Sequence, residues 1–290
     1  MSRYVKQTDD RIDLHVHTTA SDGTCSPSEV VCLAVSKGLS AIAITDHDTV
    51  SGFQEALIAS DDHDLEVIPG IEISTRFHSA VHILGYYIDG SCVELQLELD
   101  QIVKDRDLRN ERLCALMRQD GLPVEYSRLK KRFGEIIGRP HFARILTEFG
   151  LAEDVQDAFK RYLESGKPYF LRRRFLSIER SIEIISIAGG IPVLAHPFQY
   201  RLNDCELREL IEHCIIFGLR GIECFYSGYS PRQSSYLVSL AEEYGLLQTG
   251  GSDFHGAAKP HIELGTGTGT LSVPGSLLKN LKEEHEKLNR

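Results

Sequence analysis

The amino-acid sequence predicts a parallel α/β fold that is interrupted by a helical segment. Short apolar runs typical of strands alternate with helix-period stretches in both the first and the last part of the chain. Residues 92–172 carry helical patterns only. With 290 residues, of which 42% are hydrophobic, the chain is long enough for one large α/β domain with an insertion.

The first strand and the first helix follow from local patterns. Ile12, Leu14 and Val16 alternate with polar residues, which is typical of a strand. The sequence SPSE at 26–29 places Ser at the N-cap, Pro at the first helical position and Glu at the third, as in a capping box. We expect the helix that begins there to end at Gly38.

Further strands and helices continue this alternation. The apolar run AIAIT at 41–45 predicts a strand that is buried on both faces. In chain order, we then expect a helix around 51–60, strands in EVIPGIEIST and SAVHILGYYI, and, after the helical segment, a helix at 177–188, a strand in IPVLAHP, a helix at 204–217, a strand in RGIECFY, a helix at 231–244 and a strand in LLQTGG. The GTGTGT tract at 265–270 predicts a loop.

Residues 92–172 are predicted to form a helical insertion between a first α/β part at 1–91 and a second at 173–290. A long charged helix at 94–120 closes with Gly121, and RPHFARILTEFG and DVQDAFKRYLESG continue the helical pattern. Residues 121–174 hold 12 Lys and Arg against 7 Asp and Glu, although the whole chain has a net charge of −10. The basic segment favours an anionic ligand nearby, and a solvated helical surface explains the charge equally well.

Composition also excludes several classes of protein. No apolar run approaches 18 residues, so we expect no membrane span. The N-terminal MSRYVKQTDD lacks an apolar core, so no secretory signal is expected. Seven scattered cysteines without a C-x-x-C pair predict reduced, mostly buried thiols in a cytoplasmic protein. An acidic chain is not expected to bind double-stranded DNA, and we expect a monomer or a small homo-oligomer.

Histidines and carboxylates stand at or near the ends of nearly all predicted strands. A lone His in an apolar run is more often a structural residue than a ligand. In a barrel of parallel strands, however, the carboxyl ends of the strands converge on one face, and burying so many polar groups there without partners would be costly. The candidate metal ligands are His15, His17, Asp22, His47, Glu72, His82, His196, Asp253 and His255.

Nine nitrogen and oxygen ligands exceed what one ion needs. A mixed imidazole and carboxylate set without thiolate suits Mn, Fe or Zn, and a carboxylate such as Glu72 can bridge two ions. Asp13 and Asp48 either orient imidazoles or cap turns. The histidines outside this pattern are expected to be surface or structural residues: His63, His78, His213, His261 and His285.

These residues resemble the PHP family, the polymerase and histidinol phosphatase superfamily of metal-dependent phosphoesterases. The matching pieces occur in family order over almost the whole chain: DLHVH at 13–17, SDG at 21–23, TDHD at 45–48, GIEIS at 70–74, HILG at 82–85, AHP at 195–197 and GSDFH at 251–255. The resemblance implies a distorted (β/α)7 barrel whose site holds divalent metal ions, typically three and often Mn, Fe or Zn.

The chain length and the helical insertion resemble one subgroup of this family. The subgroup contains nucleotide phosphatases that act on 3′,5′-bisphosphates and a 5′-to-3′ exoribonuclease that trims short RNA. RPHFAR at 139–144 and the Lys160 to Lys167 segment are similar to it. By this resemblance, Arg139 and His141 would contact a substrate phosphate, with an ordinary charged helix start as the alternative.

One departure from the subgroup concerns the substrate. Subgroup members follow His-Pro with Gly-Arg, where the Arg is a candidate phosphate contact, whereas Phe198-Gln199 follows His196-Pro197 here. Arg201 is then the nearest candidate for that contact. We therefore leave open whether this chain acts on a different phosphoester from its relatives.

The expected activity is metal-dependent hydrolysis of phosphate esters of nucleotides or short 5′-phosphorylated RNA, by a hydroxide that bridges two ions. Asp22, Glu72, Asp253 and His255 are assigned to catalysis as well as to metal binding. We assign His15, His17, Glu72 and Asp253 to one ion, Glu72, His82 and His196 to a second, and Asp22, His47 and His255 to a third.

Two other functions fit part of the pattern. Amidohydrolases, which hydrolyse C–N bonds, also place H-x-H at the end of a first barrel strand, but they commonly bridge their metals with a carboxylated Lys, and no Lys ends a buried strand here. A barrel that uses metals only for stability would be a binding module. All nine ligand positions are filled, which favours an enzyme.

Overall fold

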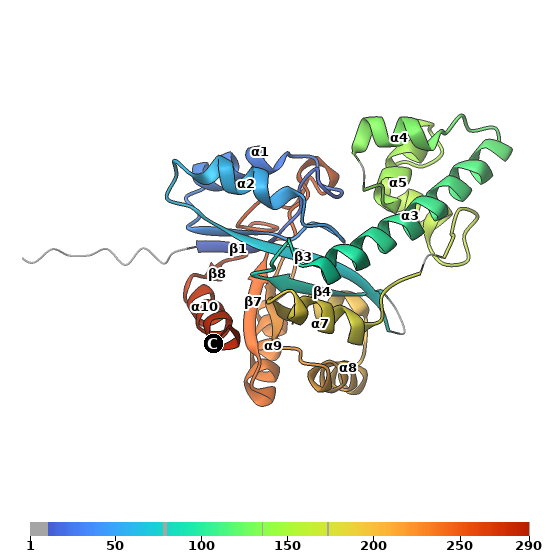
Figure 1. Ribbon diagram of the computed structural model, residues 1–290. Helices are drawn as coiled ribbons and strands as arrows, with labels where there is room; N and C mark the ends of the chain where they lie inside the picture. The colour runs from blue at the N-terminus through green and yellow to red at the C-terminus, as the bar shows by residue number, and fades with distance from the viewer. Residues whose placement is uncertain (1–10, 78–79, 135, 173, 290) are drawn as a thin grey trace, which may run out of the picture.

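The computed structural model describes residues 11–77, 80–134, 136–172 and 174–289, so the N-terminal segment and His78 lie outside the described residues. One sheet, in the order β7-β6-β5-β4-β3-β2-β1-β8, curls into a nearly closed barrel (Figure 1). Its strands are β1 (Arg11–Val16), β2 (Ala41–Ile44), β3 (Glu66–Arg76), β4 (Ala80–Tyr86), β5 (Ile191–Leu194), β6 (Gly221–Tyr226), β7 (Leu247–Gly251) and β8 (Val273–Pro274). The predicted distorted (β/α)7 barrel with a helical insertion is confirmed, and the short β8 extends the sheet beside β1.

Backbone hydrogen bonds between β1 and the segment after β7 close the barrel. The Asp253 N–H donates to the His15 carbonyl at 2.8 Å, and the His17 N–H donates to the Phe254 carbonyl at 3.0 Å. Gly251 at the end of β7 permits this approach, because a side chain there would collide with His15. Two predicted ligand segments from opposite ends of the chain are therefore neighbours.

Strand direction departs from the expected parallel arrangement at β4. This strand runs antiparallel to both β3 and β5, whereas β1, β2 and β3 are parallel to one another, as are β5, β6 and β7. The connection from Arg76 to Ala80 is too short for the crossover helix that a parallel pair needs. β4 therefore begins at the barrel mouth, which places His82 beside residues that lie at the carboxyl ends of parallel strands.

Helices cover the outer face of the barrel, with α1 and α2 on one side and α7, α8 and α9 on another (Figure 1). Their bounds are α1 (Pro27–Ser36), α2 (Gly52–Ser60), α7 (Ile178–Ile187), α8 (Asp204–Ile216) and α9 (Pro231–Tyr244), with short 3-10 turns η2 (Pro197–Tyr200) and η3 (Gly256–Ala258). The predicted capping box of α1 is present, since the Ser26 side chain accepts from the Glu29 N–H and the Glu29 carboxylate accepts from the Ser26 N–H. Each helix expected in the α/β parts is found within a few residues of its predicted bounds.

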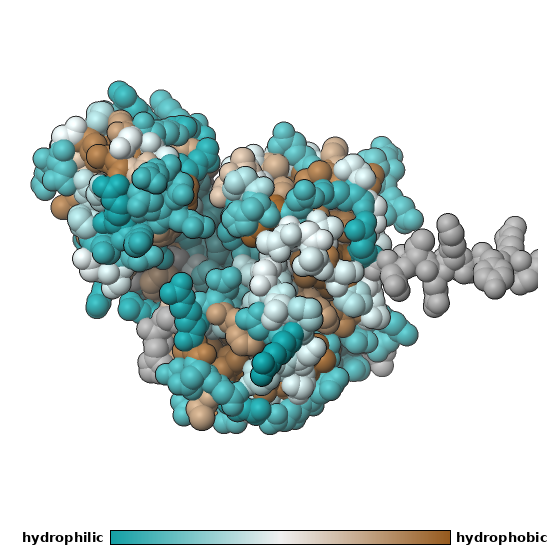
Figure 2. Space-filling model, turned by 180° about the vertical axis from the view of Figure 1, so that it is seen from behind, coloured by the Kyte–Doolittle hydropathy of each residue, from teal (hydrophilic) through white to brown (hydrophobic). Residues whose placement is uncertain are grey.

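The insertion forms a lobe beside the barrel (Figures 1 and 2). It consists of α3 (Val93–Gln119), α4 (Tyr126–Phe133), α5 (Arg139–Glu148), α6 (Val155–Ala158) and the π-helix η1 (Phe159–Leu163). Leu95, Leu99 and Ile102 in the first half of α3 pack into the barrel core, whereas Leu113 and Met117 in its second half belong to a separate core with α4 and α5. The long helix α3 thus carries the insertion, and the limits 92–172 remain our proposal for its boundaries.

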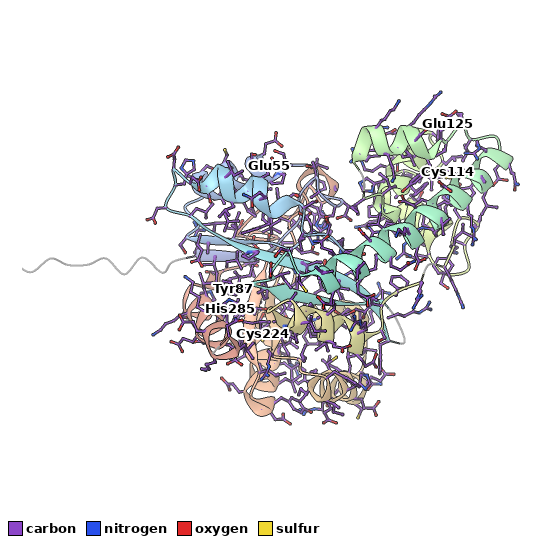
Figure 3. The ribbon with its side chains drawn as sticks, in the orientation of Figure 1. Glu55, Tyr87, Cys114, Glu125, Cys224 and His285 are labelled. Carbon is purple, nitrogen blue, oxygen red and sulfur yellow. The ribbon has the colours of Figure 1, made fainter. Side chains whose placement is uncertain are left out.

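The C-terminal segment contains a helix that was not predicted from the sequence. Helix α10 (Ser276–Leu288) is dominated by charged residues, but it buries Leu277, Leu278 and Leu281 against the barrel. In the last turn of this helix, the His285 ring stacks on Tyr87 with 4.6 Å between the centroids (Figure 3). The high charge of the segment masks three leucines that lie on one face of a helix.

The cysteines form no disulfide within the described residues, as expected. Cys114 lies in the insertion and Cys224 in the barrel (Figure 3), and these two and Cys214 are buried. Cys25 and Cys92 are half-buried, and Cys32 and Cys205 are exposed. Only three of the seven thiols are therefore buried, and the expectation that most of them are buried is wrong. Among the described helices, none combines the length and the apolar character that crossing a membrane requires.

Candidate metal centre

The structure brings all nine candidate ligands together at one end of the barrel. They form four overlapping groups whose ligand atoms lie within 4.8 Å of one another: His17, Asp22, His47 and His255; His15, His17 and Asp253; His15, Glu72 and His196; and His47, Glu72 and His82. Each strand of the sheet except β6 and β8 contributes from its end, from its middle or from the loop that follows it. The spatial convergence expected of the nine residues is therefore present.

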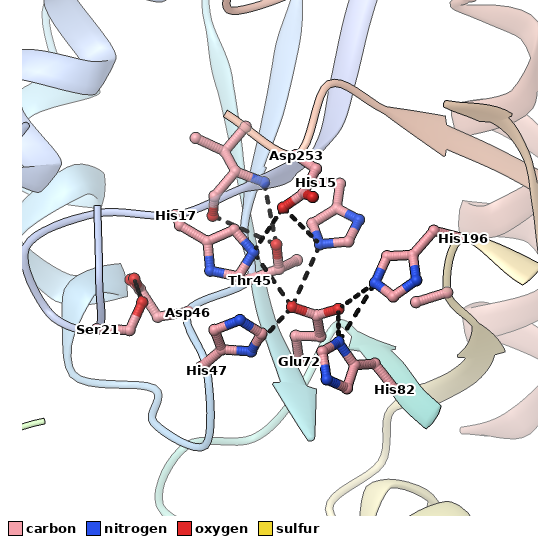
Figure 4. A network of polar contacts seen from close by, with 12 residues as sticks. His15, His17, Ser21, Thr45, Asp46, His47, Glu72, His82, His196 and Asp253 are labelled. Carbon is pink, nitrogen blue, oxygen red and sulfur yellow. Dashed lines mark hydrogen bonds and ion pairs between the residues drawn. The ribbon is translucent and has the colours of Figure 1, made fainter. Parts of the chain in front are cut away.

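Local structure explains how the first strand presents its two imidazoles. His15 and His17 are two residues apart, as required for side chains on one face of a strand, and their ring centroids are 5.2 Å apart. The loop that follows carries Asp22 and is fixed by Asp46 at the end of β2. The Asp46 carboxylate accepts from the Thr18 N–H at 2.8 Å and from the Ser21 hydroxyl at 2.5 Å (Figure 4).

Glu72 lies at the centre of the cluster, and its two oxygens face different neighbours (Figure 4). Oε1 is 2.8 Å from His82 Nδ1 and 2.9 Å from His196 Nε2. Oε2 is 3.0 Å from His47 Nδ1, 3.2 Å from His17 Nε2 and 3.4 Å from His15 Nε2. A carboxylate in this position is suited to bridge two ions.

Asp253 and Asp22 extend the cluster on the other side of His17. Asp253 Oδ1 is 3.3 Å from His17 Nε2 and 3.3 Å from His255 Nδ1. Asp22 Oδ1 is 3.2 Å from His255 Nε2. His255 therefore lies between two carboxylates, and its ring stacks on His17 at 4.0 Å.

Several ligand atoms are buried and lack a hydrogen-bond partner among the described residues. These atoms are His15 Nε2, both ring nitrogens of His17, His47 Nδ1, Glu72 Oε2 and His196 Nδ1. Leaving one buried polar group unsatisfied costs about 1–3 kcal/mol, so a cluster of such atoms needs another partner. Bound metal ions would satisfy these lone pairs, and the donor set suits Mn, Fe or Zn.

The protonation states of Glu72, Asp22 and His255 suit metal ligands. Burial alone would raise the pKa of Glu72, but the facing His82 and His47 outweigh it and hold the pKa well below its usual range. The pKa of Asp22 is likewise held well below its usual range, because His255 and His47 outweigh burial. Burial, together with the nearby His17 and Lys259, lowers the pKa of His255 to about 4. Ionised carboxylates and neutral imidazoles are the forms that bind metal.

Two features of this cluster are energetically unfavourable: the raised pKa of His47, and backbone strain at neighbouring residues. Burial would lower the pKa of His47, but the carboxylates of Glu72 and Asp22 outweigh it and raise the pKa to about 9. Among the described non-glycine residues with positive φ, Asp48, His196 and Asp253 belong to the cluster or adjoin it. Such strained conformations persist where the surrounding structure fixes them, often at functional sites.

Three residues around the cluster were missed from the sequence. Glu223 in β6 is fully buried, and its carboxylate accepts from the His196 N–H at 2.7 Å and lies 2.9 Å from His15 Nδ1. Tyr226 and Lys259 both donate to Asp253 Oδ2 at 2.6 Å. A Glu inside the apolar run RGIECFY was the one available signal, because a buried carboxylate needs a partner.

Asp13 and Asp48 bind backbone and side-chain groups other than imidazoles. Asp13 accepts from the Ser252 N–H at 2.8 Å and from the Gly265 N–H at 2.7 Å. Asp48 accepts from the Ser74 N–H at 2.9 Å and forms a buried ion pair with Arg106 of α3. Of the two alternatives left open for them, the contacts favour holding turns and strands in place.

A cavity of about 540 Å³ lies between the barrel mouth and the insertion, where the space-filling surface is hollowed (Figure 2). Asp22, His47 and His82 line it from the metal cluster. Five arginines line it as well: Arg76, Arg106, Arg109, Arg139 and Arg172. Only Arg139 and Arg172 of these five come from the basic 121–174 segment. The other three arginines come from β3 and α3, which the charge distribution of the sequence did not indicate.

The three predicted substrate contacts have different positions. Arg139 lines the cavity, and its guanidinium lies over the Phe159 ring at 5.9 Å. His141 is buried next to Phe133 and caps α5, since its Nδ1 accepts from the Gly138 N–H at 3.0 Å. Arg201 is exposed and is not among the residues that line the cavity. Of the three, the position of Arg139 alone supports a substrate contact.

The described histidines that were expected to be surface or structural residues form no part of the cluster. His213 pairs with Glu179 at 2.5 Å, and His285 stacks on Tyr87. His63 and His261 are exposed.

Removing the charge of Glu223 is expected to weaken metal binding. Glu223→Gln leaves His15 without its carboxylate partner, and such changes typically cost about 10- to 100-fold in metal affinity or activity. Titration calorimetry with Mn²⁺ measures the loss, with Glu242→Gln on the exposed face of α9 as the control. An affinity for Mn²⁺ equal to that of the unaltered protein would contradict the orienting role of Glu223.

Comparison with known proteins gives matches over most of the chain. The PHP domain model matches residues 13–213. A 5′-3′ exoribonuclease of Haemophilus influenzae is 35% identical over 84% of this chain and 90% of its own length. A 3′,5′-nucleoside bisphosphate phosphatase of Chromobacterium violaceum is 31% identical over 88% of this chain and 90% of its own length.

Solved structures agree with these sequence matches. A protein of Bifidobacterium adolescentis described as a metal-dependent phosphoesterase has a TM-score of 0.83 and 31% identity, and the match covers 94% of this chain and 95% of that one. A Chromobacterium violaceum protein described as an amidohydrolase, with bound sulfate and no metal, has a TM-score of 0.84 and 30% identity over 96% of both chains.

Proposed function

This chain belongs to the PHP domain family, and we propose that this metal-dependent phosphoesterase hydrolyses phosphate esters of nucleotides or of short 5′-phosphorylated RNA. The observation that carries the proposal is the position of the cavity. Three of the nine candidate metal ligands, Asp22, His47 and His82, line the cavity, and five arginines line it as well. A substrate that bears phosphate is the ligand that both features favour.

We propose that the nine residues hold up to three ions of Mn, Fe or Zn. Glu72 would bridge, with His82 and His196 at Oε1 and with His15, His17 and Asp253 on the side of Oε2. Asp22, His47 and His255 would hold the remaining ion. When bound, such ions supply a Lewis acid for phosphoryl oxygens and lower the pKa of a coordinated water towards neutrality.

The protein side chains would position the substrate. Arg139 is partly buried and its guanidinium lies over Phe159, so it can donate two parallel hydrogen bonds to a phosphate in the cavity. Arg109 of α3 lines the same cavity and adds positive charge. Asp22, Glu72, Asp253 and His255 would act by holding the reacting groups in place, and no Ser or Cys nucleophile is needed.

The amidohydrolase name of one structural neighbour raises C–N hydrolysis as a second candidate. Glu72 would occupy the bridging position, and within the described residues no lysine forms an ion pair with it, since Lys259 pairs with Asp253 instead. A metal-stabilised binding module is the non-catalytic alternative. The arginine-lined cavity favours phosphoester hydrolysis over both.

Activity on a panel of substrates tests the proposed function. With Mn²⁺ added, we expect phosphate release from an aryl phosphate, and faster release from a nucleoside monophosphate, a 3′,5′-bisphosphate or a short 5′-phosphorylated RNA. Cleavage of amide substrates without phosphate release would favour the amidohydrolase alternative. No turnover of any substrate would favour a binding module.

Arg139→Ala is expected to lower kcat/KM by about 10- to 100-fold, which corresponds to one charge-assisted contact. The loss should be larger for a nucleoside 3′,5′-bisphosphate than for the matching monophosphate, because the second phosphate needs its own cation. Metal content should not change. Lys131→Ala, an exposed residue of α4 that does not line the cavity, is the matched control. Equal and small losses on both substrates would mean that Arg139 has no role in capture.

A further inference from the structure

Part of the cavity is lined by aromatic and aliphatic side chains that neither metal binding nor phosphate binding uses. Phe159, Phe170, Leu171 and Phe175 are each partly buried and line the same cavity as the metal cluster. We call these four residues the ring wall. Phosphate is strongly hydrated and is bound by cations and N–H donors, so apolar rings contribute little to its recognition.

The ring wall is built on backbone that is held in place. Phe159 begins the π-helix η1, a type of helix that occurs frequently at functional sites, and Arg139 lies over its ring. Phe170 follows Tyr169, whose N–H donates to the Tyr162 carbonyl at 2.8 Å and whose hydroxyl donates to Asp120 at 2.8 Å. The ring wall therefore lies on backbone that hydrogen bonds hold in place, in the segment that returns from the insertion to the barrel.

The return segment is also attached to the barrel at its far end. Leu176, directly after Phe175, pairs with Thr75 of β3 in a parallel bridge. Arg76, the next residue of β3, lines the cavity. Rings and arginines thus line one space, which is the composition that binds a flat, polarisable ring next to an anion.

Resting on the function proposed above, we propose that the ring wall binds the nucleobase of the substrate by stacking. The cavity volume of about 540 Å³ is within the usual range for small-molecule sites. Base stacking on aromatic side chains tolerates every base, because each base has a π-face. The enzyme should therefore require a base but distinguish poorly among the four bases.

Two nucleotides that differ only in the base, together with ribose 5-phosphate, which has no base, test this proposal in the full-length, Mn²⁺-loaded protein. The wild-type kcat/KM for adenosine and uridine 5′-monophosphates should exceed that for ribose 5-phosphate by about 5- to 150-fold, the equivalent of one stacked base. The two nucleotides should differ from each other by less than about 10-fold. Equal rates on ribose 5-phosphate and the nucleotides would overturn the base site while leaving phosphoester hydrolysis intact, whereas no turnover of any of them would count against the proposed function itself.

Substitutions in the ring wall test which of its residues stack on the base. Phe170→Leu should lower kcat/KM on the nucleotides at least about 5-fold more than on ribose 5-phosphate, with Phe149→Leu, an exposed phenylalanine of the same lobe that does not line the cavity, as the control. Phe175→Leu provides a second test if the first variant does not fold. Equal losses on both substrate types would assign these rings a structural role only.

Discussion

Glu72→Ala is expected to abolish phosphoester hydrolysis. Both oxygens of Glu72 lie within 3.4 Å of imidazole nitrogens from four strands or their following loops, so its loss removes the ligand that joins neighbouring metal positions. We expect a fall of about 1,000-fold or more in kcat at saturating Mn²⁺, because the activated water depends on the ions held there. Asp253→Ala should have a similar effect, since Asp253 Oδ1 faces both His17 and His255.

The control for these variants is His285→Ala, which lies on α10 against Tyr87 and should leave activity unchanged. Circular dichroism and gel filtration would verify that each variant is folded. A folded Glu72→Ala or Asp253→Ala protein that keeps more than about a tenth of the wild-type rate at saturating metal would contradict the assignment.

Arg106→Met is expected to cause the largest loss of stability. Arg106 of α3 forms a buried ion pair with Asp48, the residue after His47, and Asp48 also accepts from the Ser74 N–H. Removing one partner of a buried pair leaves the other charge uncompensated, which typically costs about 3–5 kcal/mol of the free energy of unfolding. The midpoint of urea unfolding would measure this loss.

A second variant separates the loss of the Arg106–Asp48 ion pair from the loss of side-chain packing at Arg106. Asp48→Asn keeps an acceptor for Ser74 and tolerates the positive φ of 55° at this position, so it removes the charge with little other change. The double variant Arg106→Met with Asp48→Asn should therefore be more stable than Arg106→Met alone. If the two substitutions add their costs instead, the ion pair does not couple the insertion to the barrel.

The metal cluster was predictable from the sequence because its signals are local. Each ligand stands inside a short motif next to an apolar run, and the parallel α/β pattern places most of these strand ends on one face. His82 reaches the same face for a different reason, since β4 is antiparallel and presents its start. The short connection between the two predicted strands is a sequence signal for that direction, and the expectation of a parallel sheet did not use it.

The surroundings of the cluster could not be predicted in the same way. Glu223 is one acidic residue in an apolar strand, and its two contacts, to His15 and to the His196 N–H, come from distant segments. The arginines of the cavity come from β3, from α3 and from two places in the basic segment. Because they are far apart in the sequence, a local excess of basic residues does not reveal them. Resemblance suggested Arg139 and His141 together, but only the fold distinguishes a cavity-lining residue from a helix cap.

The metal content of the purified protein tests the central claim most directly. Nine converging ligands with unsatisfied buried atoms predict roughly one to three equivalents of Mn, Fe or Zn per chain by elemental analysis. They also predict a rise in the melting temperature when Mn²⁺ or Zn²⁺ is added to chelator-treated protein, because a ligand that binds the folded state stabilises it. Well under one equivalent of metal, together with no change in melting temperature on adding either ion, would contradict the account.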